Sequence, residues 1–140
     1  MLTPYQYTYL NLFTGNFSEA HKKFENDYWA ISIKELVNKI PVETNLISNN
    51  EKVHIAFCGL PHNLVKRELN KIKKLKYEQK NLYANDVDYI MMTNRIVEDA
   101  NDNTLANLST CFERFKGKKL VTVKRNGLVL STIKKNLMKK

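Results

Sequence analysis

The chain has 140 residues, of which 43% are hydrophobic and 10% are aromatic, and its formal net charge is +9. These proportions fit a single globular domain that buries one hydrophobic core, and they exclude an intrinsically disordered chain. No apolar run approaches the roughly 18 residues that a membrane helix needs, and the first residues lack the basic and apolar regions of a signal peptide. We therefore expect a soluble domain, which is cytoplasmic if the chain is expressed as given.

The positive charge is concentrated in two segments. Residues 66–80 carry 7 basic and 2 acidic side chains, and residues 116–140 carry 9 basic and no acidic ones. Such clusters can attract nucleic acid or anionic lipid headgroups. However, 19 of the 23 basic residues are Lys, whereas base and phosphate readout usually favours the planar fork of Arg. We interpret the surplus as a general basic surface and expect no specific nucleic-acid partner.

The first part of the chain is aromatic and then helical. Residues 4–11 place tyrosines at every second position, which is typical of an extended segment, and a short helix is predicted over residues 19–25. Ser32 and Glu35 match the capping-box pattern at the start of a helix. The apolar spacing that follows predicts one buried helix face, and Pro41 is expected to end this helix.

The rest of the chain alternates strands and helices and ends in a hairpin. Asn126-Gly127 lies between two apolar runs, and this dipeptide is the strongest short hairpin signal. The expected elements in chain order are a buried strand over 53–58, a turn at 59–61, a helix over about 62–74, a short strand near 75–78, a strand over 87–93, a helix over 104–116, and hairpin strands over 120–124 and 128–133.

This order predicts an α/β fold. Strands separated by helices favour parallel pairing through right-handed crossovers, and the terminal hairpin adds antiparallel strands. We expect a small mixed β-sheet of four to five strands with helices packed on it and a C-terminal β-hairpin. Residues 1–140 are interpreted as a single domain, in which residues 1–31 form an aromatic N-terminal segment and residues 32–140 form the α/β core.

The sequence shows no recognisable catalytic or metal site. Two cysteines are too few for a disulfide scaffold; Cys58 and Cys111 both lie in apolar patterns, so buried free thiols are favoured, with one bridge as the alternative. His54, Cys58 and His62 are spaced by four, but they fall on a strand, at its end and on the next helix, and a structural zinc site needs a fourth ligand. Cys58 and His62 could form a nucleophile and its base, but nothing near them in the sequence identifies a group that would orient the base. We predict no catalytic residue, no metal and no cofactor.

One segment combines aromatic and acidic side chains immediately before the first strong helix signal. Asp27, Tyr28 and Trp29 stand together, and Trp29 is the only tryptophan of the chain. Such residues can anchor a helix on a sheet, and an aromatic ring beside a carboxylate is also a common sugar-binding combination. From the chemistry of these residues alone, the anchoring role is favoured.

The N-terminal segment resembles a known stretch of bacterial membrane glycosyltransferases. The matching residues are Pro4-Tyr5-Gln6-Tyr7-Thr8-Tyr9-Leu10-Asn11, Gly15, Ala20, Phe24-Glu25, Asp27-Tyr28-Trp29, Ser32 and Lys34-Glu35. They are similar to a "PYQY…YN…DYWG.S" stretch in the dolichyl-phosphate-mannose–protein mannosyltransferase group, C-type enzymes that use polyprenyl-phosphate sugars. Asp88-Tyr89-Ile90, Asn94-Arg95 and the terminal hairpin also look similar to that family, although Ala30 replaces its glycine.

The resemblance implies a non-catalytic role. In that family the stretch opens a C-terminal soluble domain at the extracytoplasmic (periplasmic) face, and catalysis belongs to the membrane portion, so this chain is expected to be a separate tail domain. Its partners would be the membrane-embedded glycosyltransferase portion and, through the basic surface, anionic lipid headgroups. The residues implied in docking on the catalytic part, or in binding the acceptor, are Tyr5, Gln6, Tyr9, Asn11, Asp27, Tyr28 and Trp29; we favour docking.

Two other functions remain open from the sequence. One is a free-standing cytoplasmic basic α/β module that binds nucleic acid through its lysines. The other is a small enzyme that uses Cys58 and His62, which requires a reactive thiol at Cys58.

Overall fold

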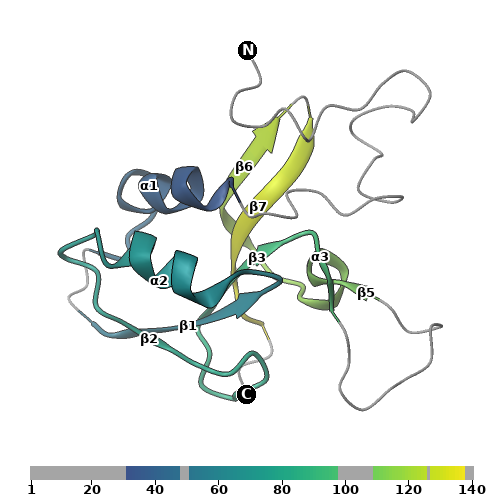
Figure 1. Cartoon of the computed structure of the whole chain (residues 1–140). Coiled ribbons are helices and arrows are strands. Elements are labelled where there is room, and N and C mark those ends of the chain that lie inside the picture. Colours follow the sequence, from purple (N-terminus) through teal and green to yellow (C-terminus); the bar gives the residue numbers. More distant parts are fainter. Residues whose placement is uncertain (1–30, 48–50, 98–108, 126, 138–140) are drawn as a thin grey trace.

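The computed structural model describes residues 31–47, 51–97, 109–125 and 127–137 (Figure 1). Within these ranges the chain alternates helices and strands. In chain order the elements are α1 (Ile33–Glu43), β1 (Val53–Cys58), α2 (His62–Leu69), β2 (Tyr77–Gln79), β3 (Tyr89–Thr93), β4 (Ile96–Val97), β5 (Ser109–Thr110), α3 (Cys111–Arg114), β6 (Lys119–Arg125) and β7 (Leu128–Lys135).

Five of the strands form one mixed sheet in the order β2-β1-β3-β7-β6. β1 pairs in parallel with β2 and with β3, and β7 pairs antiparallel with both β3 and β6. β4 and β5 form a separate antiparallel pair. The structure therefore confirms the predicted small α/β fold with a mixed sheet and a C-terminal hairpin. β4 was not predicted, and β5 lies within residues 104–116, where the prediction of a helix is wrong for Ser109 and Thr110.

The two faces of the sheet bury different elements, because successive strand residues point to opposite sides. Ile55 and Met91 belong to a large core cluster with the apolar faces of α1 and α2. Their neighbours Ala56 and Met92 belong to a second cluster with Cys111 of α3. We call these the helix face and the disulfide face of the sheet; in Figure 1, α1 and α2 lie next to each other, away from α3.

Two irregularities in the β6–β7 hairpin change which residues face the helices. The pairing slips between Lys119 and Val121 and again between Val123 and Lys124, so Leu120 in β6 and Leu130 in β7 are each an extra residue without an opposite partner. A β-bulge of this kind resets the alternation of side chains along a strand. As a result Leu120 packs against the helix-face core beside its neighbour Val121.

α1 buries the predicted face but begins and ends differently from the prediction. Ser32 makes no side-chain cap, so the predicted capping box is wrong; its hydroxyl hydrogen-bonds to Ser131 instead, and Glu35 forms an ion pair with Arg125 of β6. Pro41 does not end the helix, which continues to Glu43. The helix can continue because Pro41 removes only one backbone N–H donor. The Thr44 amide still donates to the Ile40 carbonyl at 3.1 Å.

α2 is shorter than predicted. It ends at Leu69 rather than near residue 74, and the amides of Ile72 and Leu75 then donate to the carbonyls three residues earlier. These successive turns keep a three-residue spacing, so Ile72 and Leu75 still pack on the helix-face core. The apolar pattern correctly predicted which side chains are buried, but Ile72 and Leu75 lie in turns and not in a continuous helix.

The predicted helix over residues 104–116 is described only in part. Residues 104–108 lie outside the described residues, and the described helix is the four-residue α3. Its start carries a true capping box, in which the Glu113 amide donates to the Thr110 hydroxyl and the Thr110 amide donates to the Glu113 carboxylate.

Cys58 and Cys111 form a disulfide, so the expectation of buried free thiols is wrong and the alternative holds. The bond joins the end of β1 to the first residue of α3, and both residues are almost fully buried. Gly59 makes this approach possible, because its φ is +67° and a Cβ there would lie 2.6 Å from the Cβ of Arg95 and 3.2 Å from the Cys111 sulfur. Sequence spacing alone could not reveal a contact between residues 53 positions apart.

Candidate functional site

The seven residues that the sequence singled out cannot be placed. Tyr5, Gln6, Tyr9, Asn11, Asp27, Tyr28 and Trp29 all lie outside the described residues. The structure does show where the chain that follows them enters the fold. Ile31 packs on Leu128 and Leu130 of β7. The described domain therefore begins with a residue that packs on the hairpin.

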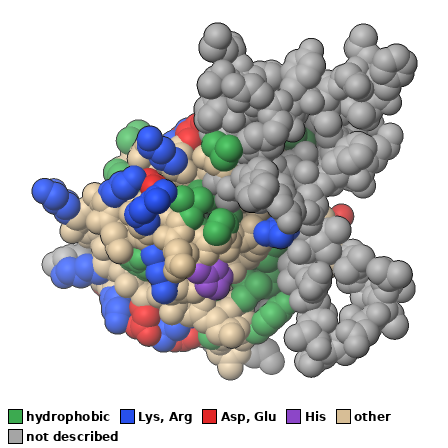
Figure 2. All heavy atoms as spheres, in the orientation of Figure 1, with side chains coloured by type: hydrophobic (Ala, Val, Ile, Leu, Met, Phe, Trp, Pro, Cys, Tyr) green, Lys and Arg blue, Asp and Glu red, His purple; other side chains and the backbone are tan. Residues whose placement is uncertain are grey.

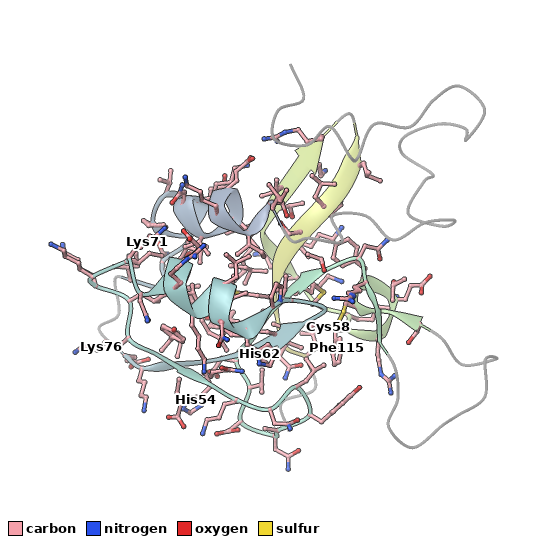
Figure 3. The ribbon with its side chains drawn as sticks, viewed as in Figure 1. His54, Cys58, His62, Lys71, Lys76 and Phe115 are labelled. Atoms are coloured by element: carbon pink, nitrogen blue, oxygen red, sulfur yellow. A yellow bond between two sulfur atoms is a disulfide. The ribbon has the colours of Figure 1, made fainter. Side chains whose placement is uncertain are left out.

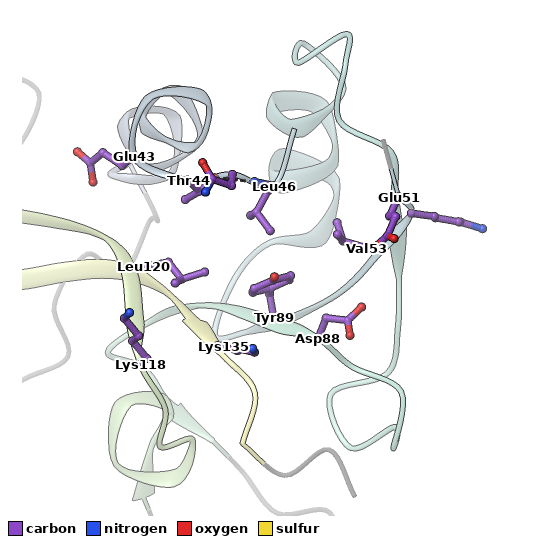
Figure 4. Close-up of a pocket in the computed structure, with 12 residues that line it drawn as sticks. Glu43, Thr44, Leu46, Glu51, Val53, Asp88, Tyr89, Lys118, Leu120 and Lys135 are labelled. Atoms are coloured by element: carbon purple, nitrogen blue, oxygen red, sulfur yellow. Dashed lines mark hydrogen bonds between the residues drawn. The ribbon is translucent and has the colours of Figure 1, made fainter. Parts of the chain in front are cut away.

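One candidate site is an open depression on the helix face of the sheet, with a volume of about 500 Å³ (Figure 4). It lies where the end of α1, the first residues of β1 and β3, and the open end of the β6–β7 hairpin meet. The residues that line it are Glu43, Thr44, Asn45, Leu46, Glu51, Lys52, Val53, Asp88, Tyr89, Lys118, Leu120 and Lys135.

The floor of the depression is apolar and centred on an aromatic ring. Tyr89 is the first residue of β3 and pairs with Ile55 on one side and Lys135 on the other, so its backbone is held within the sheet. Leu46, Val53 and Leu120 pack around it as part of the helix-face core or against it. Because this backbone is paired on both sides, the ring is presented at a fixed position.

The rim carries charges of both signs. Three lysines face three carboxylates around the floor: Lys52, Lys118 and Lys135 with Glu43, Glu51 and Asp88. Eight of the twelve lining residues are polar or charged, so the depression is more polar than a usual small-molecule site. An aromatic ring surrounded by such donors and acceptors suits a polyhydroxylated ligand, whose C–H faces stack on the ring and whose hydroxyls hydrogen-bond at the edge.

Asp88 is fixed by the neighbouring strand. Its carboxylate accepts a hydrogen bond from the backbone amide of His54 at 2.9 Å, and its own amide donates to the His54 carbonyl at 2.9 Å. The His54 ring is held in turn, since Nδ1 lies 3.0 Å from the carbonyl oxygen of Asp86. His54 therefore helps to hold the segment before β3, and through it the rim of the depression.

An ion-pair network continues from this edge along the sheet. Glu78 contacts Lys52 at 2.6 Å and Lys80 at 3.0 Å, and Lys80 contacts Asp86 at 2.8 Å. Hydrogen bonds from Lys52 and Lys80 lower the pKa of Glu78 to about 2, and the bond from Lys80 lowers the pKa of Asp86. Both carboxyls are therefore ionised at neutral pH, so they suit electrostatic binding rather than proton donation.

The other chemical candidates from the sequence do not come together (Figure 3). The Cys58 sulfur is bonded to Cys111, so it is not a thiol nucleophile. The His62 ring lies against Phe57, with centroids 5.4 Å apart, and its Nδ1 is 2.9 Å from the Gln79 amide nitrogen. In the described part of the chain, no group of three or more His, Cys, Asp or Glu side chains could hold a metal ion.

A basic surface covers α2 and the turns that follow it (Figure 2). We define it as the exposed side chains Lys66, Arg67, Lys71, Lys73, Lys74 and Lys76. Glu68 lies beneath it, only 4% exposed, and contacts Lys71 at 2.5 Å and Arg67 at 3.3 Å. The hydrogen bond from Lys71 lowers the pKa of Glu68, so this carboxylate stays ionised and offsets part of the positive charge.

Comparison with known proteins gives no family for the chain. No protein-family model matches it, and neither does any curated protein or any solved structure. Each helix within the described ranges is too short or too polar to span a bilayer. The function has to be inferred from the sequence resemblance and from the depression, the disulfide and the basic surface.

Proposed function

We propose that the chain is the non-catalytic C-terminal domain of a membrane glycosyltransferase, at the extracytoplasmic face of the membrane, where it docks on the catalytic part or helps to bind the acceptor. The observation that carries the proposal is the depression with Tyr89 at its floor. Its volume of about 500 Å³ is within the usual range for small-molecule sites. Together with the resemblance over residues 4–35, its aromatic floor and polar rim suit a carbohydrate or a glycosylated acceptor.

The disulfide supports the extracytoplasmic location. Disulfides form and persist in oxidising compartments and are rare in the cytosol, where thiols are kept reduced. Cys58 and Cys111 are bonded and buried in the core of the disulfide face. A cytoplasmic nucleic-acid module is therefore less compatible with the structure, and the bonded sulfur also disfavours an enzyme that uses a Cys58 thiol.

The basic surface supports a position near the membrane. Its side chains project from α2 and the following turns, and anionic headgroups attract juxtamembrane lysines. Docking through Tyr5, Gln6, Tyr9, Asn11, Asp27, Tyr28 and Trp29 stays a prediction, since these residues lie outside the described ranges. Ile31, which follows them, contacts the hairpin, so we assign docking to that end of the domain and acceptor binding to the depression.

The test of acceptor binding is an NMR titration of the oxidised protein with oligosaccharides and short glycopeptides. We expect the largest shifts at Tyr89, Leu46 and Leu120, and we expect Tyr89→Ala to weaken binding by about tenfold, through loss of the stacking surface. Tyr89→Phe keeps the ring and should bind nearly as well. Tyr83→Ala removes an exposed tyrosine that does not line the depression, and it serves as the control.

Two outcomes would count against the proposal. One is a titration in which no glycan shifts the signals of the depression at millimolar concentration. The other is a genomic neighbourhood without any reading frame, fused or adjacent, that encodes a protein with many membrane spans. Co-purification of the chain with such a neighbour, lost when Trp29 and Tyr28 are both changed to Ala, would support docking.

A further inference from the structure

A second cavity lies on the disulfide face of the sheet and has a volume of about 310 Å³. It is separate from the depression, because the two have no lining residue in common. The residues that line it are Asn94, Thr110, Phe112, Glu113, Lys116, Lys119, Gly127, Val129 and Lys134. Its most unusual component is Lys134 of β7, which is only 5% exposed.

The Lys134 ammonium is held at the end of α3. It donates to the carbonyl oxygen of Phe115 at 2.8 Å and to that of Phe112 at 3.1 Å, and it lies 5.7 Å from the centre of the Phe112 ring. The carbonyls at a helix C-terminus and an aromatic face are both favourable neighbours for a cation. An ammonium has three N–H donors, and the two carbonyls take two of them.

No carboxylate within the described residues pairs with Lys134. Glu113 also lines the cavity, but its carboxylate accepts from the amide and the hydroxyl of Thr110, at 3.0 Å and 3.2 Å. Two further lysines, Lys116 and Lys119, line the same cavity, and neither forms an ion pair with a described residue. Burial, followed by repulsion from Lys119 and Lys116, lowers the pKa of Lys134.

Among the described residues, this arrangement leaves a buried cation without a carboxylate partner. A buried cation that lacks a counter-ion carries a desolvation cost, and nearby like charges add to it. An apolar residue of similar shape would avoid both effects. An anion in the cavity would reduce this cost, because it would supply the negative charge that Lys134, Lys116 and Lys119 lack as a group.

The hairpin places two of the three lysines side by side. Lys119 of β6 and Lys134 of β7 are direct partners across the strand pair. The extra residue at Leu130 then returns Val129 to the disulfide face, so that Val129 and Gly127 close the cavity beside them. Lys119 and Lys134 are thus held by paired strands, and Lys116 lies in the segment between α3 and β6.

We propose that this cavity binds a phosphate group, carried by a small phosphate monoester or by a lipid headgroup, with Lys134 as the buried ligand and Lys116 and Lys119 at the mouth. A tetrahedral oxyanion offers several acceptors in different directions, which suits three separate ammonium groups. The Thr110 hydroxyl is a further polar group at the site. The volume exceeds what a bare phosphate fills, which leaves room for a small attached group. This inference does not depend on the proposed acceptor site.

The test measures binding of inorganic phosphate and of glycerol 3-phosphate by ³¹P NMR and by thermal shift, against sodium chloride of equal ionic strength. Lys134→Met keeps an unbranched side chain that is one atom shorter and removes its charge, and we expect it to weaken binding by about tenfold or more. Lys119→Met changes an exposed residue, so the fold is retained even if Lys134→Met does not fold, and it should weaken binding by about fivefold. Lys73→Met, in the turns after α2, is the matched control and should bind like the parent.

A parallel arm uses vesicles of phosphatidylcholine with and without phosphatidic acid. If the protein binds the free phosphates, and Lys134→Met or Lys119→Met abolishes this binding, the site belongs to a soluble ligand. Binding of the phosphatidic acid vesicles alone, lost in the same variants and kept in Lys73→Met, assigns it to a lipid headgroup. The proposal is overturned if phosphate stabilises the protein no more than chloride does and neither vesicle binds, or if Lys119→Met and Lys73→Met weaken binding equally.

Discussion

The hydroxyl groups of Ser32 and Ser131 are joined by a buried hydrogen bond of 2.6 Å, although 99 residues separate them in the chain. Ser32 precedes α1 and Ser131 lies within β7, so the bond ties the start of the helix to the sheet. Both residues are fully buried. This contact also explains why Ser32 does not cap its own helix.

We expect Ser131→Ala to lower the free energy of unfolding by about 1–2 kcal/mol, because a buried hydroxyl on Ser32 then loses a partner. The double variant Ser32→Ala/Ser131→Ala should cost less than the sum of the two single variants, since neither hydroxyl is left behind. Urea unfolding of the four proteins measures the coupling. Strictly additive effects would show that the two hydroxyls do not interact.

The disulfide is expected to contribute strongly to stability. It closes a loop with a sequence separation of 53 residues, and a loop of this size corresponds to about 4 kcal/mol of unfolded-state entropy. Reduction, or the double change Cys58→Ala/Cys111→Ala, should therefore lower the free energy of unfolding by about 2–4 kcal/mol. The measurement is denaturant unfolding with and without a reductant. Labelling of two thiols in the untreated, denatured protein would contradict the bond.

Gly59 is expected to tolerate no side chain. Gly59→Ala forces a Cβ into a left-handed backbone and to within 2.6 Å of the Arg95 Cβ, so it should lower the free energy of unfolding by about 2 kcal/mol or more. Gly59→Asn separates the two causes, since asparagine tolerates this backbone better but carries the same Cβ. If steric contact dominates, the asparagine variant remains nearly as unstable; full recovery would show that only the backbone conformation matters.

The ion-pair network predicts a dependence of stability on acidic pH. The folded-state pKa of Glu78, about 2, is below its ordinary value of 4.5. The contribution of Glu78 to the stability of the folded state is therefore present above pH 4.5 and is lost as the pH falls toward 2. Glu78→Gln should flatten the loss of stability in that window, measured by urea unfolding at a series of pH values. Glu51→Gln changes an exposed carboxylate outside the network and should leave the slope unchanged.

Local patterns predicted much of the fold. The spacing of Ile33, Leu36, Val37 and Ile40 identified the buried face of α1, and Asn126-Gly127 marked the position of the hairpin. The strand over 53–58 has the predicted bounds. These features depend on residues that are neighbours in sequence, so periodicity and turn chemistry are sufficient to find them.

The site could not be found in the same way. The depression joins Leu46, Val53, Tyr89 and Leu120, which come from four separate segments, and Leu120 reaches it only because of a bulge. The disulfide and the burial of Lys134 likewise depend on contacts between distant residues. None of the depression's lining residues was among the seven that the sequence singled out, which all lie outside the described residues.

The extra residue at Leu130 decides which side chains of the hairpin tip face each side of the sheet. With it, Leu128 and Leu130 contact Ile31, while Val129 lines the lysine cavity. Deleting one residue there would restore strict alternation and rotate the hairpin tip by half a turn relative to its base. Insertions and deletions at this position should therefore be far less tolerated than substitutions, because a change of length exchanges the inner and outer surfaces of the tip.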